Sequence, residues 1–211
     1  MRQVPLESNS AREPKVGAGV VGRSVGGLRL FASCASFVLL CLVLARSHAE
    51  SFSEVEVRAV YLFNFAVFVD WPPTAFESST SPIRYCVVGS QALRASLEEV
   101  LADEHVGGRA LRLISANEPL DWRRCHLLYI GHGAKTRARQ ILKAVRGTAV
   151  LTIGASEAFV REGGMIGLVR RGQRLRTIID RDAAERVGIR ISSKLLRLST
   201  LVSGTREGVS P

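Results

Sequence analysis

The sequence has few of the residues that define fibrous or disulfide-rich proteins. Its 211 residues include only 7 Pro, 19 Gly and 4 Cys, with neither a G-X-Y period nor a sustained heptad. No uncharged run is longer than sixteen residues. Collagen-like, coiled-coil and globally disordered chains are therefore excluded, because 46% of the residues are apolar and can form a core.

Acidic residues are also in short supply. Lys and Arg number 29 against 19 Asp and Glu, which gives a formal net charge of +10. An excess of this size is typical of proteins that bind nucleic acid or other anions. However, the first 49 residues hold six basic and two acidic side chains, so four of the ten charges lie outside the expected fold.

The one long uncharged run lies near the start of the chain. Leu30–Ala45 follows two arginines and precedes Ser47 and Ala49, which fit the −3 and −1 positions of a signal peptide. We expect Sec-dependent export to the periplasm and cleavage after Ala49, so that residues 1–49 are the signal peptide and 50–211 the mature domain. A membrane span needs ~20 apolar residues, so retention as an N-terminal membrane anchor is the alternative.

Only two cysteines remain after that cleavage, Cys86 and Cys125. Thiols in an oxidising compartment usually pair, so the sequence predicts a Cys86–Cys125 disulfide. Two reduced core cysteines, or a metal or redox site, are the alternatives.

Short apolar runs alternate with helical stretches along the mature chain. Strands are expected at 83–88, 111–114, 126–130 and 150–153, and helices at 57–69, 91–101 and 137–145. This alternation predicts a mainly parallel sheet with helices on both faces. Residues 165–169 and 174–179 flank a basic turn and predict an antiparallel hairpin near the C-terminus. The expected fold is a single three-layer α/β domain.

Two glycine-containing loops resemble enzyme motifs without completing them. Gly131, Gly133 and Lys135 follow a strand but lack the glycine spacing of a phosphate loop, so their N–H groups offer at most an anion site. Ser156 resembles a nucleophile elbow, but no His follows His132, so Ser156 is expected to cap a helix. Neither H-E-x-x-H nor a CxxC pair is present. We expect no enzymatic activity, metal or cofactor.

The predicted hairpin is rich in arginine. The four side chains are Arg170, Arg171, Arg174 and Arg176. A solvated edge that resists aggregation is one interpretation. The other is an anionic partner: a phospholipid head group, a cell-wall polymer or an acidic protein face. Nucleic acid is disfavoured by the expected compartment and by the lack of interleaved aromatic residues.

Five segments of the mature chain form a recognisable series. They are the AVYLFNF and VDWP strings of residues 59–72, the two cysteines, VLTIG at 150–154, GGMI at 163–166 and GIRISSKLL at 188–196. In this order they resemble the YfiR (HmsC-like) family of small periplasmic regulators. The resemblance covers roughly Val55 to Val202.

The resemblance implies a non-enzymatic protein that represses a membrane-bound diguanylate cyclase by binding its periplasmic region. Release would raise cyclic-di-GMP and favour biofilm. The expected partner is the periplasmic domain of an inner-membrane signalling protein, and a homodimer is also considered. Candidate residues for the partner surface come from two apolar segments: Phe159, Gly163, Gly164, Met165, Leu195 and Leu196.

A periplasmic small-ligand-binding module of another sensor or transport system is the alternative function. Open parallel sheets bind ligands at the carboxyl ends of their strands. In this chain those ends carry Gly89, Gly131 and Gly154.

Overall fold

The computed structural model describes residues 53–116 and 119–203, and the expected signal peptide lies outside them. Within these ranges, no helix has the length and apolar character needed to cross a membrane. The helices are α2 (Glu54–Val67), α3 (Gln91–Val100), α4 (Pro119–Trp122), α5 (Ala138–Ala144), α6 (Glu157–Arg161), α7 (Arg181–Glu185) and α8 (Ser193–Arg197), with 3-10 turns η2 (Pro73–Ala75) and η3 (His132–Arg137).

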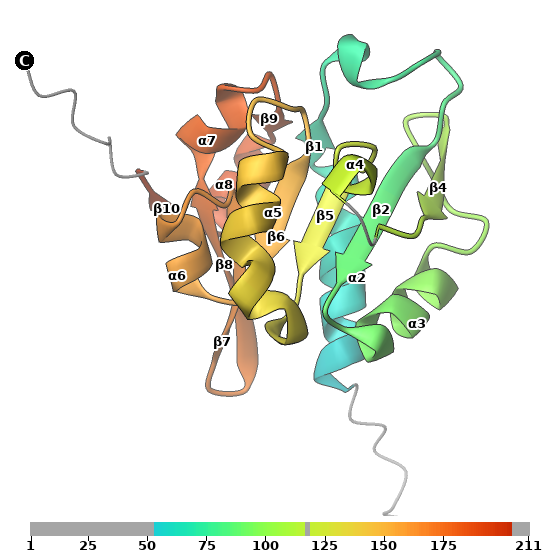
Figure 1. The fold of residues 1–211 in the computed structure, drawn as a ribbon. Helices are drawn as coiled ribbons and strands as arrows, with labels where there is room; N and C mark the ends of the chain where they lie inside the picture. The colour runs from blue at the N-terminus through green and yellow to red at the C-terminus, as the bar shows by residue number, and fades with distance from the viewer. Residues whose placement is uncertain (1–52, 117–118, 204–211) are drawn as a thin grey trace, which may run out of the picture. The chain divides into compact units, whose positions relative to one another are not determined.

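An eight-stranded sheet forms the middle layer, in the order β10-β8-β7-β6-β5-β2-β4-β3 (Figure 1). Its strands are β2 (Ile83–Val88), β3 (His105–Val106), β4 (Arg109–Leu113), β5 (Leu127–Ile130), β6 (Leu151–Gly154), β7 (Ile166–Arg171), β8 (Arg174–Asp180) and β10 (Thr200–Val202). The central strands β4, β2, β5, β6 and β7 are parallel, and β7 and β8 form the antiparallel hairpin. The predicted α/β class is confirmed.

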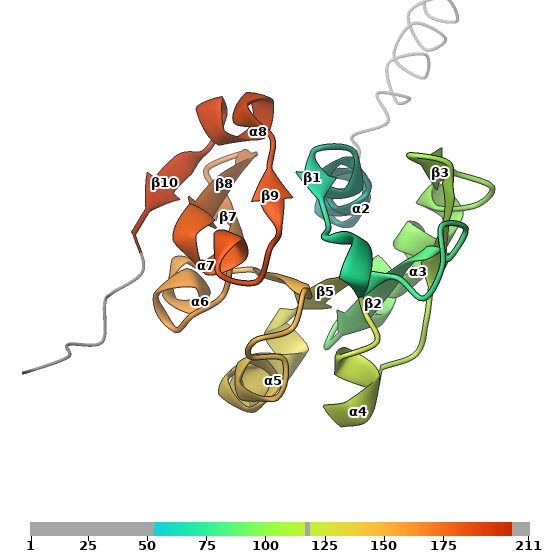
Figure 2. The same cartoon turned by 90° about the horizontal axis from the view of Figure 1, so that it is seen from above.

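Helices cover both faces of this sheet, as expected from the alternating pattern. Viewed from above, α2 and α3 lie on one face, and α4, α5 and α6 lie on the other (Figure 2). The buried side chains accordingly form two clusters, one on each side. A separate two-stranded sheet joins β1 (Val69–Asp70) to β9 (Arg190–Ile191) and ties the end of α2 to the C-terminal part of the chain.

Helix α2 begins with a capping box in which the Ser53 side chain accepts from the Glu56 N–H and the Glu56 carboxylate accepts from the Ser53 N–H. Its buried apolar side chains lie along one stripe, at Ala59, Leu62, Phe65 and Ala66, which confirms a core helix, whereas Val60 and Val67 are exposed. The buried Arg58 was not anticipated, because a basic residue on a helix is usually solvated. Its guanidinium donates to the Leu168 carbonyl oxygen and pairs with Glu54.

Candidate functional site

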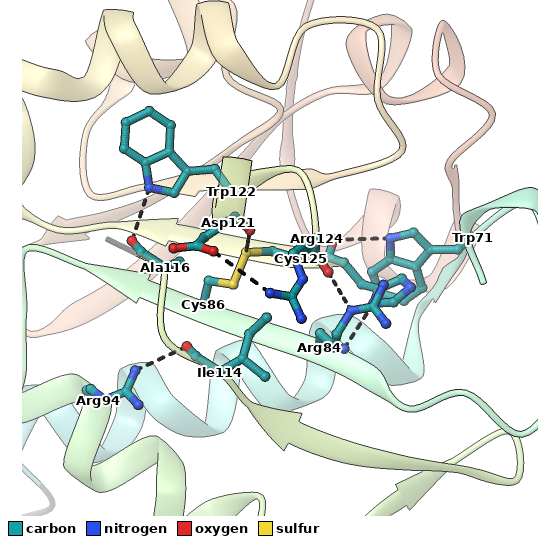
Figure 3. The surroundings of a disulfide bond; sticks show 11 residues. Trp71, Arg84, Cys86, Arg94, Ile114, Ala116, Asp121, Trp122, Arg124 and Cys125 are labelled. Carbon is teal, nitrogen blue, oxygen red and sulfur yellow. Dashed lines mark hydrogen bonds and ion pairs between the residues drawn. A yellow bond between two sulfur atoms is a disulfide. The ribbon is translucent and has the colours of Figure 1, made fainter. Parts of the chain in front are cut away.

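The predicted disulfide between Cys86 and Cys125 is confirmed. It joins strand β2 to the residues just before β5, with 5.9 Å between the two Cα atoms (Figure 3). Both cysteines are buried, and β2 and β5 are adjacent parallel strands. The bridge therefore fixes two neighbouring core strands that are separated by 39 positions in the sequence.

A polar cavity of about 320 Å³ lies beside the disulfide, at the amino ends of β2, β5 and β6. Three arginines line it, Arg84, Arg123 and Arg124, and we call this cavity the arginine basin. Arg84 Nε donates to the Arg124 carbonyl oxygen, and Arg123 Nε donates to the Ala144 carbonyl oxygen. Backbone groups thus hold two of the guanidiniums in place. Arg84 and Arg124 also form ion pairs with Glu77 and Asp121, so Arg123 is the basin arginine for which no carboxylate partner is described. A small anion would be bound by arginines that are already positioned.

The wall of the arginine basin is organised around His126. Its Nδ1 accepts from the Arg84 N–H, and its Nε2 lies 3.0 Å from the Ala75 carbonyl oxygen. The ring stacks on Phe76, and Trp71 Nε1 donates to the His126 carbonyl oxygen. Burial lowers the pKa of His126 to about 4. The imidazole is therefore neutral near pH 7, and the positive charge of the basin comes from arginine.

The carboxyl ends of the strands, where an anion or ligand was expected, are closed by close backbone packing. A Cβ on Gly89 would overlap Ala134, and one on Gly131 or Gly133 would lie 2.8 Å from the Gly89 oxygen. The Gly131 and Gly133 N–H groups already donate to Val88 and Gly89. The two glycine N–H groups of the predicted anion site are therefore already used within the fold, and Lys135 is exposed.

The ligand site expected at Gly89, Gly131 and Gly154 fails for the same reason. At the third of these strand ends, the Phe159 ring occupies the space next to Gly154. The cavity of the arginine basin lies at the opposite, amino ends of the strands.

Most of the predicted partner surface belongs to the core. Phe159 is 5% exposed and Met165 and Leu195 are similarly buried, while Gly164 packs against the Phe159 ring. The prediction that Phe159, Met165 and Leu195 contact a partner is wrong, because the sheet and its helices cover these side chains. Gly163 is exposed and Leu196 is partly exposed, so neither is excluded from an interface.

The four hairpin arginines lie on strands β7 and β8, and two of them form ion pairs with described residues while the other two do not. Arg170 pairs with Glu54 at 2.8 Å, and Arg171 pairs with Glu157 at 2.8 Å. Arg174 and Arg176 are exposed and make no ion pair with any described residue.

The residues that resemble a hydrolase motif serve a structural purpose. Ser156 is the N-cap of α6 and its hydroxyl accepts from the Phe159 N–H, as expected. Across residues 53–116 and 119–203, no group of three or more His, Cys, Asp or Glu side chains is placed to hold a metal ion. His126 was missed as an organising residue because an isolated histidine carries no spacing signal; the Trp71-Pro72 string was the available clue.

Fold and site together define a disulfide-bonded, three-layer α/β domain. An arginine-lined cavity lies at the amino ends of its central strands, and an arginine-rich hairpin extends from the carboxyl end of β7. The sequence profile of the family described as YfiR/HmsC-like (DUF4154) matches residues 55–200. The chain belongs to the YfiR/HmsC-like family, which confirms the resemblance read from its motifs.

The solved structures that are similar to the chain include the following two. A conserved domain protein from Vibrio cholerae O1 biovar El Tor shares 18% identity at a TM-score of 0.46, over 71% of this chain and 60% of that chain. An ABC domain in complex with L-Trp from Streptococcus pneumonia shares 9% identity at a TM-score of 0.41, over 58% and 55%. The chain thus spans less than two thirds of either. No curated protein matches the sequence.

Proposed function

We propose that the protein is a periplasmic regulator that represses a membrane-bound diguanylate cyclase by binding its periplasmic region. The family match over residues 55–200 carries this proposal, since membership supports a periplasmic regulator of the YfiR type. The protein acts by binding rather than by catalysis. In support, Ser156, the residue that resembles a catalytic nucleophile in the sequence, accepts a hydrogen bond from the Phe159 N–H as a helix cap.

Deletion of the gene should raise cellular cyclic-di-GMP several-fold and increase biofilm, because the cyclase loses its repressor. Mass spectrometry of extracted nucleotides measures the first effect. Complementation with the full chain should restore the low level, whereas a chain without residues 1–49 should not, because it stays in the cytoplasm. In a strain whose neighbouring cyclase is inactivated, deletion should change nothing. An unchanged level with an intact cyclase would contradict the proposal.

A second candidate function is the binding of a small anion in the arginine basin. The observation that favours it is the cavity itself, lined by Arg84, Arg123 and Arg124. Two of these guanidiniums are fixed by backbone carbonyls, so little side-chain entropy is lost when an anion binds.

Phosphate or citrate, at ionic strength matched with NaCl, should raise the melting temperature of the purified protein by about 3–6 °C at a concentration tenfold above Kd. Arg123→Gln should abolish the shift, whereas Arg112→Gln, on the exposed face of β4, should preserve it. His126 is neutral at both pH 6 and pH 8, so a change in the shift between these pH values should follow the charge of phosphate or citrate and not the titration of the histidine. Equal shifts in both variants would rule out the basin as the site.

A further inference from the structure

The arginine-rich end of the domain has too few acidic groups to neutralise it. Glu54 pairs with both Arg58 and Arg170. In the same way, Glu157 pairs with both Arg161 and Arg171. Each carboxylate therefore serves two guanidiniums. Arg174 and Arg176 lie on the same hairpin without an ion-pair partner in the described part of the chain.

The register of the hairpin places like charges together. Arg171 lies directly opposite Arg174, and Val169 lies opposite Arg176. Residues that face each other across two strands share one side of the sheet, so Arg171, Arg174 and Arg176 project from the same side. Like charges directly opposite each other are destabilising, and a bound anion would offset this repulsion.

The hairpin tip also lacks the apolar and aromatic side chains that form the centre of most protein interfaces. The run from Arg170 to Arg174 is Arg-Arg-Gly-Gln-Arg, without an apolar side chain. Specific protein–protein interfaces normally have an apolar or aromatic centre that is shielded from water. A charged membrane surface needs no such centre, because its phosphates are numerous and exchangeable and guanidinium groups bind phosphate bidentately.

The position of the tip favours the same ligand. Figure 1 shows that the β7–β8 hairpin extends at the end of the domain where α2 begins, away from α7 and β9. Glu54, the first residue of α2, is joined to the hairpin through Arg170. The hairpin tip therefore projects from one end of the domain, where a flat anionic surface can reach it.

We propose that the tip of the β7–β8 hairpin, through Arg171, Arg174 and Arg176, binds the phosphate groups of anionic phospholipids at the membrane surface. This contact holds the exported domain close to the membrane, where its proposed partner resides. The interaction is electrostatic and peripheral, so salt weakens it.

Vesicle co-sedimentation of the protein purified from the periplasm tests this inference. The protein should bind phosphatidylcholine vesicles that contain phosphatidylglycerol, but not pure phosphatidylcholine vesicles, and 0.5 M NaCl should release it. Arg174→Gln/Arg176→Gln should weaken binding about thirtyfold. Arg186→Gln/Arg190→Gln removes the same charge from the C-cap of α7 and from β9 and should weaken binding much less. Neither Arg174 nor Arg176 has a described ion pair, and Arg174 lies opposite Arg171, so the hairpin variant should melt at or slightly above the wild-type temperature.

Three outcomes would overturn the inference. Equal loss in the two double variants would mean that net charge alone drives binding. Absence of wild-type binding to anionic vesicles at low salt would exclude a lipid ligand. If the wild type did not bind vesicles and the Arg174→Gln/Arg176→Gln variant lost binding to the cyclase domain, the ligand of the hairpin would be an acidic protein surface instead of lipid. The cyclic-di-GMP measurement is separate, so this inference can fail while the proposed function stands.

Discussion

Cys86→Ser should lower the free energy of unfolding by about 3–4 kcal/mol under oxidising conditions. The bridge closes a loop between positions 39 apart, and its loss frees the unfolded chain to explore many more conformations. Both cysteines are buried, so the variant also leaves a hydroxyl and a thiol inside the core. Urea denaturation of the oxidised wild type and the variant measures the difference.

The same experiment with reductant provides the control. Reduced wild-type protein should unfold at nearly the same urea concentration as Cys86→Ser, and Cys125→Ser should behave like its partner variant. If the wild type were equally stable with and without reductant, the disulfide would contribute nothing to stability.

Local chemistry made much of the fold predictable. The limits of β2, the β7–β8 hairpin and the cap at Ser156 follow from short-range patterns, and the structure confirms them. The pairing of β10 with β8 and of β1 with β9 was missed. Strands of two or three residues show no periodicity, and their partners are set by tertiary packing.

The site was predicted less well, because sequence patterns do not separate core from interface. The disulfide was predictable, since the compartment and the cysteine count leave few choices. The glycines at the strand ends allow backbone to approach backbone, not a ligand. The cavity instead depends on Arg84 and on the adjacent Arg123 and Arg124, two segments of the chain that only the fold brings together.

Phe159 gives the second large effect, because it is a core residue rather than a partner contact. Phe159→Ala should cost about 3–4 kcal/mol, the usual range for removing a buried aromatic ring. The ring is 5% exposed and packs against Gly154 and Gly164. Leu198→Ala is the matched control, since Leu198 is 82% exposed and its truncation should change stability by less than ~0.5 kcal/mol. If Phe159→Ala left the free energy of unfolding unchanged, Phe159 would not be a core residue.

Alanine substitutions at the adjacent Gly163 and Gly164 distinguish the effect of packing against Phe159 from the effect of backbone strain. A Cβ on Gly164 would overlap the Phe159 ring, so Gly164→Ala should cost about 1–3 kcal/mol alone and less in the Phe159→Ala background, where the new methyl enters vacated space. Gly163 has φ of +99° and open space around its Cβ direction. Gly163→Ala should therefore be strained equally in both backgrounds. Urea denaturation measures the free energy of unfolding of each glycine variant alone and combined with Phe159→Ala. A smaller cost of Gly164→Ala in the Phe159→Ala background, with an unchanged cost of Gly163→Ala, would show that the GGMI segment packs against the ring. Unchanged costs of both glycine variants would mean that the ring does not contact Gly164.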